Sequence, residues 1–168
     1  MAAGESSFDV VSQFDRQELV NAVDQALREV HTRYDLKDSG TTIELDGSTV
    51  KLHSASEMTL ESVRDLLLQK AVRRKLSPKI FDYGKVEEAS KGTVRQTAQL
   101  RHGLNQDLAR EITRLIREQL PKLKTQVQGD AVRVTGKSKD ELQAAIQLLR
   151  KAEQDRNWAV PLQFINYR

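Results

Sequence analysis

Apolar and polar residues alternate along two short segments of the chain that resemble each other and lie about 82 positions apart. The first segment spans residues 45–52 and the second spans residues 127–134, and each contains a glycine, Gly47 or Gly129, between two alternating runs. Such alternation is typical of strands with one buried face, and the glycine marks the turn of a hairpin. A helical pattern follows each hairpin. A repeat of nearly half the chain predicts two similar small domains that arose by internal duplication.

The remaining periodicity predicts the same order of elements in each half. In the first half we expect a strand at 7–12, a helix at 15–34, a hairpin at 41–53, a helix at 59–76 and a strand at 79–83. In the second half we expect a strand at 93–101, a helix at 105–120, a hairpin at 124–135, a helix from 138 and a strand at 162–167. The order β-α-β-β-α-β is that of the ferredoxin-like fold, an α+β class with helices on one face of an antiparallel sheet. Exchange of a terminal strand between the halves is compatible with this periodicity.

The boundary between the halves is expected in a polar segment. Residues 84–92 are bracketed by glycines. We therefore predict a first domain at 1–84, a connection at 85–92 and a second domain at 93–168. The pattern also predicts that Tyr34 is buried on the first helix and that four aromatic residues of the outer strands lie in the cores: Phe8, Phe81, Phe164 and Tyr167.

The composition favours a protein of the cytoplasm. The chain has 168 residues and no cysteine, which excludes disulfides and thiolate metal sites and fits a reducing compartment. Residues 1–7 show neither the basic nor the apolar region of a secretory signal. No apolar run approaches the roughly 20 residues that span a bilayer. We expect a cytoplasmic protein without a membrane partner.

The net charge of +3 is unevenly distributed along the chain. Residues 1–84 contain 11 Lys and Arg against 14 Asp and Glu, whereas residues 85–168 contain 16 against 10. A basic half suggests a polyanion partner, although solvated helix faces are often basic as well. The candidate polyanion surface consists of Arg110, Arg114, Arg117, Lys122 and Lys124. The densest basic run is interpreted as a solvated helix end: Lys70, Arg73, Arg74, Lys75 and Lys79.

The sequence Gly136-Lys137-Ser138 resembles the end of a phosphate-binding loop. A P-loop has four residues between its first glycine and the GK[ST] sequence, but six separate Gly129 from Gly136 here, so the motif is not matched. Two interpretations remain. The position is either an anion site at a helix N-terminus or an ordinary strand-to-helix turn with a capping box formed by Ser138 and Glu141.

Signals of an enzyme are weak. The three histidines are isolated, and no hydrolase or zinc-protease motif is present. We therefore expect no catalytic residue, no metal site and no cofactor. The hairpin strands also lack the aromatic residues on which ferredoxin-like RNA-binding sheets stack bases.

Several segments resemble the bacterial YajQ family, in order and over nearly the whole chain. These are the opening Ser7-Phe8-Asp9-Val10-Val11-Ser12, Asn21-Ala22, residues 33–37, residues 128–143 and the ending at residues 162–168. The sequence departs mildly from the family pattern at Lys139-Asp140-Glu141, where a basic residue and two aspartates are usual. The resemblance implies two ferredoxin-like domains and a cytoplasmic nucleotide-binding protein, in a family connected with cyclic di-GMP and with nucleic acid. Its implied phosphate-binding residues are Arg33, Lys37, Arg95, Arg133 and Lys137.

Three functions follow from these observations. The leading hypothesis is a non-enzymatic effector that binds cyclic di-GMP or a GTP-like nucleotide and signals through a protein partner such as a transcription regulator. The first alternative is an RNA- or tRNA-binding protein that uses the basic second half. The second alternative is a structural or chaperone-like interaction protein.

Overall fold

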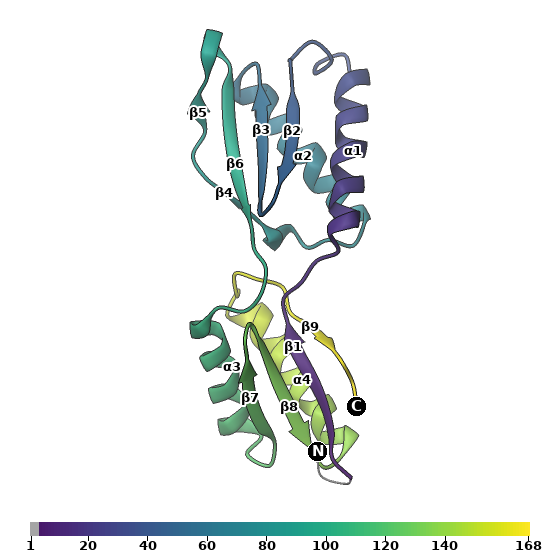
Figure 1. The fold of residues 1–168 in the computed structure, drawn as a ribbon, viewed down its shortest axis with the longest axis vertical. Coiled ribbons are helices and arrows are strands. Elements are labelled where there is room, and N and C mark those ends of the chain that lie inside the picture. Colours follow the sequence, from purple (N-terminus) through teal and green to yellow (C-terminus); the bar gives the residue numbers. More distant parts are fainter. Residues whose placement is uncertain (1–3) are drawn as a thin grey trace. The chain divides into compact units, whose positions relative to one another are not determined.

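The computed structural model describes residues 4–168, which form two compact α+β units (Figure 1). The continuous unit consists of residues 14–101, and the discontinuous unit combines residues 4–13 with residues 102–168. Each unit has its own antiparallel sheet and its own hydrophobic core. The predicted α+β class with two ferredoxin-like halves is confirmed.

The discontinuous unit has the element order β-α-β-β-α-β. Its elements are β1 (Ser6–Val11), α3 (Gln106–Gln119), β7 (Lys124–Gln128), β8 (Ala131–Gly136), α4 (Lys139–Asp155) and β9 (Gln163–Ile165). The strand order in its sheet is β7-β8-β1-β9, with antiparallel pairing throughout.

The continuous unit contains the same elements in a permuted order. They are α1 (Arg16–Thr32), β2 (Thr42–Asp46), β3 (Thr49–Ser54), α2 (Glu57–Arg73), a 3₁₀ turn η1 (Pro78–Ile80), β4 (Phe81–Tyr83), β5 (Glu87–Glu88), a turn η2 (Ser90–Gly92) and β6 (Val94–Leu100). The sheet order is β2-β3-β6-β4, and β5 also pairs with β6.

The two sheets have exchanged their equivalent central strands. β6 lies between β3 and β4 in one sheet, just as β1 lies between β8 and β9 in the other. The predicted boundaries at 1–84, 85–92 and 93–168 are therefore corrected, because β1 belongs with the C-terminal elements and β6 with the preceding ones. Residues 85–92 are not a connection between domains, since Glu87 and Glu88 pair with β6. Both central strands alternate in the same way, so periodicity does not distinguish their sheets.

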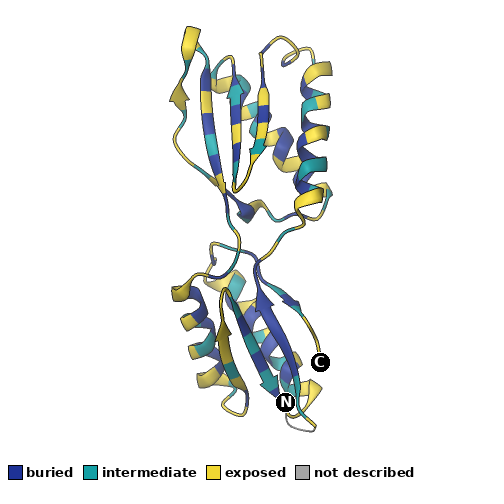
Figure 2. Ribbon diagram, in the orientation of Figure 1, coloured by how far each residue is buried: buried dark blue, intermediate teal, exposed yellow. Residues whose placement is uncertain are grey.

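The cores consist of the residues that the alternation predicts (Figure 2). Phe8, Phe81 and Phe164 are buried as expected. Tyr167 and Tyr34 are not: 63% of Tyr167 and 90% of Tyr34 are exposed. Tyr34 lies outside the core because α1 ends at Thr32 and the chain turns away from the helical face.

No helix within residues 4–168 has both the length and the hydropathy needed to cross a membrane. The expectation about a secretory signal concerns residues 1–7, of which residues 1–3 lie outside the described part of the chain.

Candidate anion-binding groove

A groove with a volume of about 840 Å³ lies in the continuous unit, along α1 and the C-terminal part of α2. Five cationic side chains line it, together with two carboxylates and two neutral polar side chains. The cations are Arg28, Lys70, Arg73, Arg74 and Lys75, the carboxylates are Glu18 and Glu29, and the neutral residues are Gln25 and Thr32. We refer to this feature as the α1–α2 groove.

The amphipathic pattern of the two helices places these side chains along one line. In α1 the buried residues include Leu19, Ala22, Ala26 and Val30, so the polar residues between them remain accessible beside the core. Asp15 caps α1 by accepting hydrogen bonds from the backbone N–H groups of the first turn. The cations of α2 fall in its last turn and just beyond it, where positive charge is favoured by the helix dipole.

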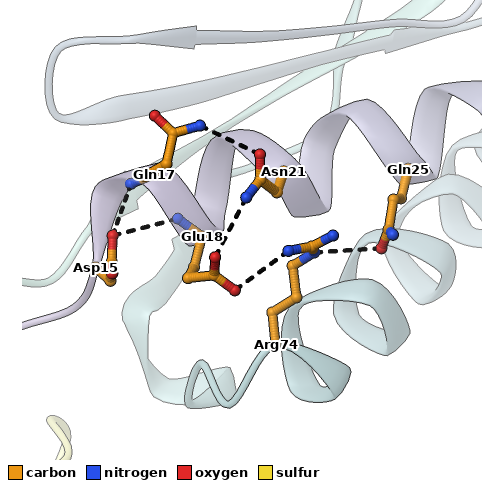
Figure 3. Close-up of polar contacts among 6 residues, drawn as sticks. All are labelled: Asp15, Gln17, Glu18, Asn21, Gln25 and Arg74. Atoms are coloured by element: carbon orange, nitrogen blue, oxygen red, sulfur yellow. Dashed lines mark hydrogen bonds and ion pairs between the residues drawn. The ribbon is translucent and has the colours of Figure 1, made fainter.

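Arg74 joins the two helices across the groove. Its Nε donates to Oε1 of Gln25 at 3.3 Å, and its Nη1 donates to Oε2 of Glu18 at 3.3 Å (Figure 3). The other carboxylate oxygen of Glu18 accepts a hydrogen bond from the side-chain amide of Asn21 at 3.2 Å. These contacts hold the guanidinium of Arg74 in one orientation.

Lys70 forms the second link. Only 9% of this residue is exposed, and its ammonium donates to Oε1 of Glu29 at 3.0 Å. Both carboxylates of the groove therefore already neutralise a cation, while Arg28, Arg73 and Lys75 are exposed along the same groove. The lining has three more positive than negative charges, which favours an anionic ligand. The sequence suggested that the whole basic run is a solvated helix end. In the structure four of its five residues line the groove, and only Lys79 does not.

Arg33 and Lys37 lie just beyond the groove, in the turn that follows α1. Arg33 donates to the carboxylate of Asp35 from Nε at 3.0 Å and from Nη2 at 2.7 Å, and this contact lowers the pKa of Asp35. Lys37 lies over the ring of Tyr34, with 5.3 Å between its nitrogen and the ring centroid.

The loop that carries Arg33 and Lys37 is fixed by buried hydroxyl groups. The hydroxyl of Ser39 contacts that of Thr41 at 2.6 Å, and Thr41 contacts Ser54 on β3 at 3.0 Å. All three side chains are buried. Buried polar networks of this kind hold a loop in a single conformation when every member is satisfied.

Arg95 lies on β6, on the sheet face opposite the helices. It donates to Oε2 of Glu87 at 3.1 Å and pairs in register with His53. One ring nitrogen of His53 lies 3.4 Å from the carbonyl oxygen of Gly40, in the loop that follows Lys37. Arg95 thus lies beside the strand that carries His53, but it does not line the α1–α2 groove.

Arg133 and Lys137 belong to the discontinuous unit. Arg133 on β8 donates to Asp9 at 2.9 Å and lowers the pKa of that carboxyl group. Ser138 caps α4 by accepting from the backbone N–H of Glu141 at 3.2 Å, and the carboxylate of Glu141 accepts from the backbone N–H of Lys137 at 3.2 Å. The predicted cap by Ser138 is confirmed, but the reciprocal bond of a capping box is shifted by one residue, because Glu141 accepts from Lys137 and not from Ser138. This bond places a carboxylate at the helix start and so disfavours an anion there.

The candidate polyanion surface is exposed. Arg110, Arg114 and Arg117 lie on the exposed face of α3, and Lys122 and Lys124 are also exposed.

The charge asymmetry of the two sequence halves is not retained by the units, because the exchanged strands redistribute the charges. The continuous unit contains 15 Lys and Arg against 14 Asp and Glu, and the rest of the chain contains 12 against 10.

The open sheet faces carry polar residues where base-stacking aromatics would be needed. The outward positions of β3 and β6 include Lys51, His53, Arg95, Thr97 and Gln99. Within residues 4–168, no three His, Asp or Glu side chains are grouped in a way that could hold a metal ion.

Comparison with known proteins shows to which family the chain belongs. A family model described as "Nucleotide-binding protein YajQ-like" matches residues 6–168. The chain belongs to the YajQ family. A relative from Chloroflexus aggregans, named "Nucleotide-binding protein", is 59% identical over 165 residues, which cover 98% of this chain and 99% of the relative. A relative from Picosynechococcus, also named a nucleotide-binding protein, is 52% identical over 166 residues, which cover 99% of both chains.

In this YajQ family member the sequence interpretation missed one half of the groove. Arg28 and Thr32 on α1 follow Gln25 at helical spacing, and this row was a usable signal. These residues line a groove only because α1 packs beside α2. That packing is a property of the tertiary structure and cannot be read from local periodicity.

Proposed function

We propose that this protein binds a nucleotide through its phosphate groups in the α1–α2 groove, and that the ligand is a cyclic dinucleotide such as cyclic di-GMP. The observation that carries the proposal is the convergence of five cations from two helices on a groove whose two carboxylates are already paired. The nucleotide-binding names of relatives at 52–59% identity support the ligand class.

Size and charge favour a ligand with more than one phosphate. The volume of about 840 Å³ lies within the range of roughly 300–1,000 Å³ typical of small-molecule sites. The excess of three positive charges exceeds the charge of one phosphodiester and suits the two of a cyclic dinucleotide. Arg28 and Arg73 can each bind a phosphate through two N–H groups, whereas Lys70 and Arg74 are held in place as a pre-ordered floor.

The phosphate-binding residues implied by the family resemblance extend this proposal. Arg33 directly follows Thr32 of the groove lining, so Arg33 and Lys37 would contact a ligand that extends past the end of α1. Arg95, Arg133 and Lys137 stay proposals for a second contact region, each to be tested by its own substitution. A ligand that displaces Glu87 from Arg95, or Asp9 from Arg133, must compensate for the lost ion pair.

The proposed role is that of a non-enzymatic effector. Ligand binding would alter the affinity for a protein partner, such as a transcription regulator, without chemical change of the nucleotide. The RNA-binding alternative loses the support of the charge asymmetry, since the two units carry net charges of about +1 and +2. It remains a distinct outcome of the binding experiment.

The test is calorimetric titration of the full chain with cyclic di-GMP, GTP and a short RNA, each at two salt concentrations. We expect saturable binding of cyclic di-GMP that persists at the higher salt. The double substitution Arg28→Glu and Arg73→Glu should weaken it by roughly 100-fold or more, given about 1.5–3 kcal/mol for each charge-assisted contact.

The matched control is Lys85→Glu with Lys151→Glu, two exposed lysines outside the groove that give the same change of net charge. This control should bind as the wild type does. Equal losses in both double variants would mean that binding depends on net charge alone. Loss with Arg133→Glu or Lys137→Glu, but not with the groove variant, would place the ligand in the discontinuous unit.

A further inference from the structure

β7 is an edge strand of the discontinuous unit, and its side chains are poorly covered compared with those of its counterpart in the other repeat. The counterpart is β2, the edge strand of the continuous unit. Ile43 of β2 is only 6% exposed and Leu45 packs partly against the core. The equivalent residues of β7 are Thr125, which is half-buried, and Val127, which is 50% exposed.

Val127 is exposed on the side of the sheet that faces the helices. It lies opposite Val132, which is fully buried beneath α3 and α4, and directly opposed residues of antiparallel strands lie on the same face. An apolar side chain on the core side of an edge strand is therefore left in contact with water. The strand also presents a row of backbone N–H and C=O groups that its own sheet does not use.

The common protections of edge strands are limited in β7. Proline, an inward-pointing charge and a very short strand all hinder the addition of another strand. β7 has five residues, Lys-Thr-Gln-Val-Gln, with its charge at the first position only. That residue, Lys124, is at the opposite end of β7 from Val127. Its ammonium nitrogen lies 3.7 Å from a carboxylate oxygen of Glu5. The edge at Gln126, Val127 and Gln128 is exposed and uncharged.

The exposed face of the neighbouring helix carries a row of arginines, beside the exposed carboxylates of Asp107 and Glu118. α3 packs against β7, and Arg110, Arg114 and Arg117 recur on its exposed face at spacings of four and three. Glu111 offsets them less, because its carboxylate accepts a hydrogen bond from Arg156, which follows α4, at 2.7 Å, and this contact lowers the pKa of Glu111. An incoming segment with carboxylates is attracted to this surface.

We propose that β7 is a docking edge for an extended, acidic segment of a partner protein. The segment adds as a further strand beside β7, places an apolar side chain against Val127 and directs its carboxylates toward the arginines of α3. Addition of a strand uses backbone hydrogen bonds for affinity and alternate side chains for specificity. A peptide fits these observations better than RNA, because an exposed valine and an open backbone edge offer nothing to a phosphate chain.

The test uses the full chain with isotope labels and, as the probe, a short peptide with the sequence Thr-Glu-Thr-Val-Thr-Glu-Thr. Its Val and both Glu are two positions apart, so they lie on the same face of an added strand. We expect saturable binding with NMR shifts centred on the amides of Lys124–Gln128. A peptide with Lys in place of Glu should not bind. The acidic peptide N-methylated at every second amide should also lose binding, because it cannot pair with the edge.

Two protein variants separate the contributions of charge and of the edge. Arg110→Glu with Arg114→Glu should weaken the acidic peptide by about tenfold or more, and the control Lys85→Glu with Lys151→Glu should not. Val127→Asp should weaken it as well. All substituted residues are exposed, and equal circular dichroism will verify that each variant is folded.

Three results would overturn the proposal. They are absence of peptide binding, equal binding of the N-methylated peptide, and binding of a short RNA that depends on Arg110 and Arg114 but not on Val127. These results are independent of nucleotide binding in the α1–α2 groove, which the same variants leave intact.

Discussion

The guanidinium of Arg133 donates from Nε to Oδ1 of Asp9 at 2.9 Å and thereby joins residues that are 124 positions apart in the sequence. The other carboxylate oxygen of Asp9 accepts from the side-chain amide of Asn166 at 2.8 Å. A single carboxylate on β1 is thus bound from β8 and from the segment after β9. These side-chain contacts stabilise the pairing of the N-terminal strand β1 with the sheet of the C-terminal elements.

We expect Asp9→Asn to lower the free energy of unfolding by about 1.5–3 kcal/mol near neutral pH, the usual contribution of hydrogen bonds to a charged group. The side chain of Asp9 is only 10% exposed, so water cannot replace its partners well. Urea unfolding of both proteins measures the difference. Asp35→Asn is the control, because Arg33 and Asp35 form an exposed pair whose loss should change stability much less.

The stabilisation by Asp9 should also depend on pH. Its hydrogen bond with Arg133 holds the pKa of Asp9 below its ordinary value, so the unfolded state takes up this proton first as the pH falls. The contribution is complete above the unfolded pKa of about 3.9 and disappears as the pH falls through the folded pKa. Wild type and Asp9→Asn should therefore converge in stability toward about pH 2. A difference that stays constant down to this pH would show that the carboxylate charge is not the stabilising feature.

A second prediction concerns Gly136 and Gly129, which are required for different reasons. At Gly136 the space is too small for a side chain, and at Gly129 the backbone is left-handed. A Cβ at Gly136 would lie 2.6 Å from Cδ2 of Leu123, in the packed core at the start of α4. Gly136→Ala should therefore destabilise the protein by about 1–3 kcal/mol through overpacking. Gly129 has open space around it but a φ of +59°, so Gly129→Ala should cost about 1–2 kcal/mol through backbone strain alone.

Gly47 provides the internal control for this comparison. It is the repeat counterpart of Gly129, with a φ of +55° and open space around it, so Gly47→Ala and Gly129→Ala should have similar effects. Substituting Asn, which tolerates the left-handed region, should recover stability at both turns but not at Gly136. Thermal unfolding of the variants tests this, and recovery at Gly136 would contradict the packing explanation.

Much of the fold could be predicted from the sequence because its local signals agree with one another. The turn at Gly47 and its copy at Gly129, the caps at Asp15 and Ser138, and the alternation within the hairpins all act over a few residues. The pairing of β1 and β6 could not be predicted in the same way. Both are alternating strands that occupy equivalent positions, and only long-range contacts such as Asp9 with Arg133 decide between the two sheets.

The candidate site was less predictable for a related reason. Lys70, Arg73 and Arg74 are visible as a basic run, but Glu18, Gln25 and Arg28 acquire a role only when α1 lies beside α2. Residues implied by the family resemblance, such as Arg95 and Arg133, have ion-pair partners that are far from them in sequence or on another strand. The list of phosphate-binding residues therefore remains a prediction.

Tyr83 gives a third prediction, at alkaline pH. Burial raises the pKa of Tyr83 to about 12, and its ring lies against Phe81 with 6.0 Å between centroids. Between the ordinary pKa of about 10 and pH 12 the folded state retains a proton that the unfolded state loses, so stability should fall with rising pH in this window. Tyr83→Phe should show a smaller fall. Titration of the phenolate absorbance should show that Tyr83→Phe removes a component near pH 12, and loss of a component near pH 10 instead would contradict the burial argument.

The exchange of strands makes a prediction about fragments of the chain. Residues 14–101 contain the complete sheet β2-β3-β6-β4 and every member of one hydrophobic core, so this fragment should fold by itself. Residues 1–84 match the boundary suggested by the repeat but lack β6, the strand that pairs with both β3 and β4. Without it the sheet is split and Val50 and Leu52 lose their neighbours, so we expect no cooperative unfolding. Circular dichroism melts and the dispersion of amide NMR signals compare the two fragments.

The control is the substitution Ala98→Asp, at a fully buried position of β6. It should abolish folding of fragment 14–101 and so verify that the unfolding transition of this fragment depends on β6. A cooperative transition in fragment 1–84, with none in fragment 14–101, would mean that each half retains its own first strand and that the exchange does not occur in solution.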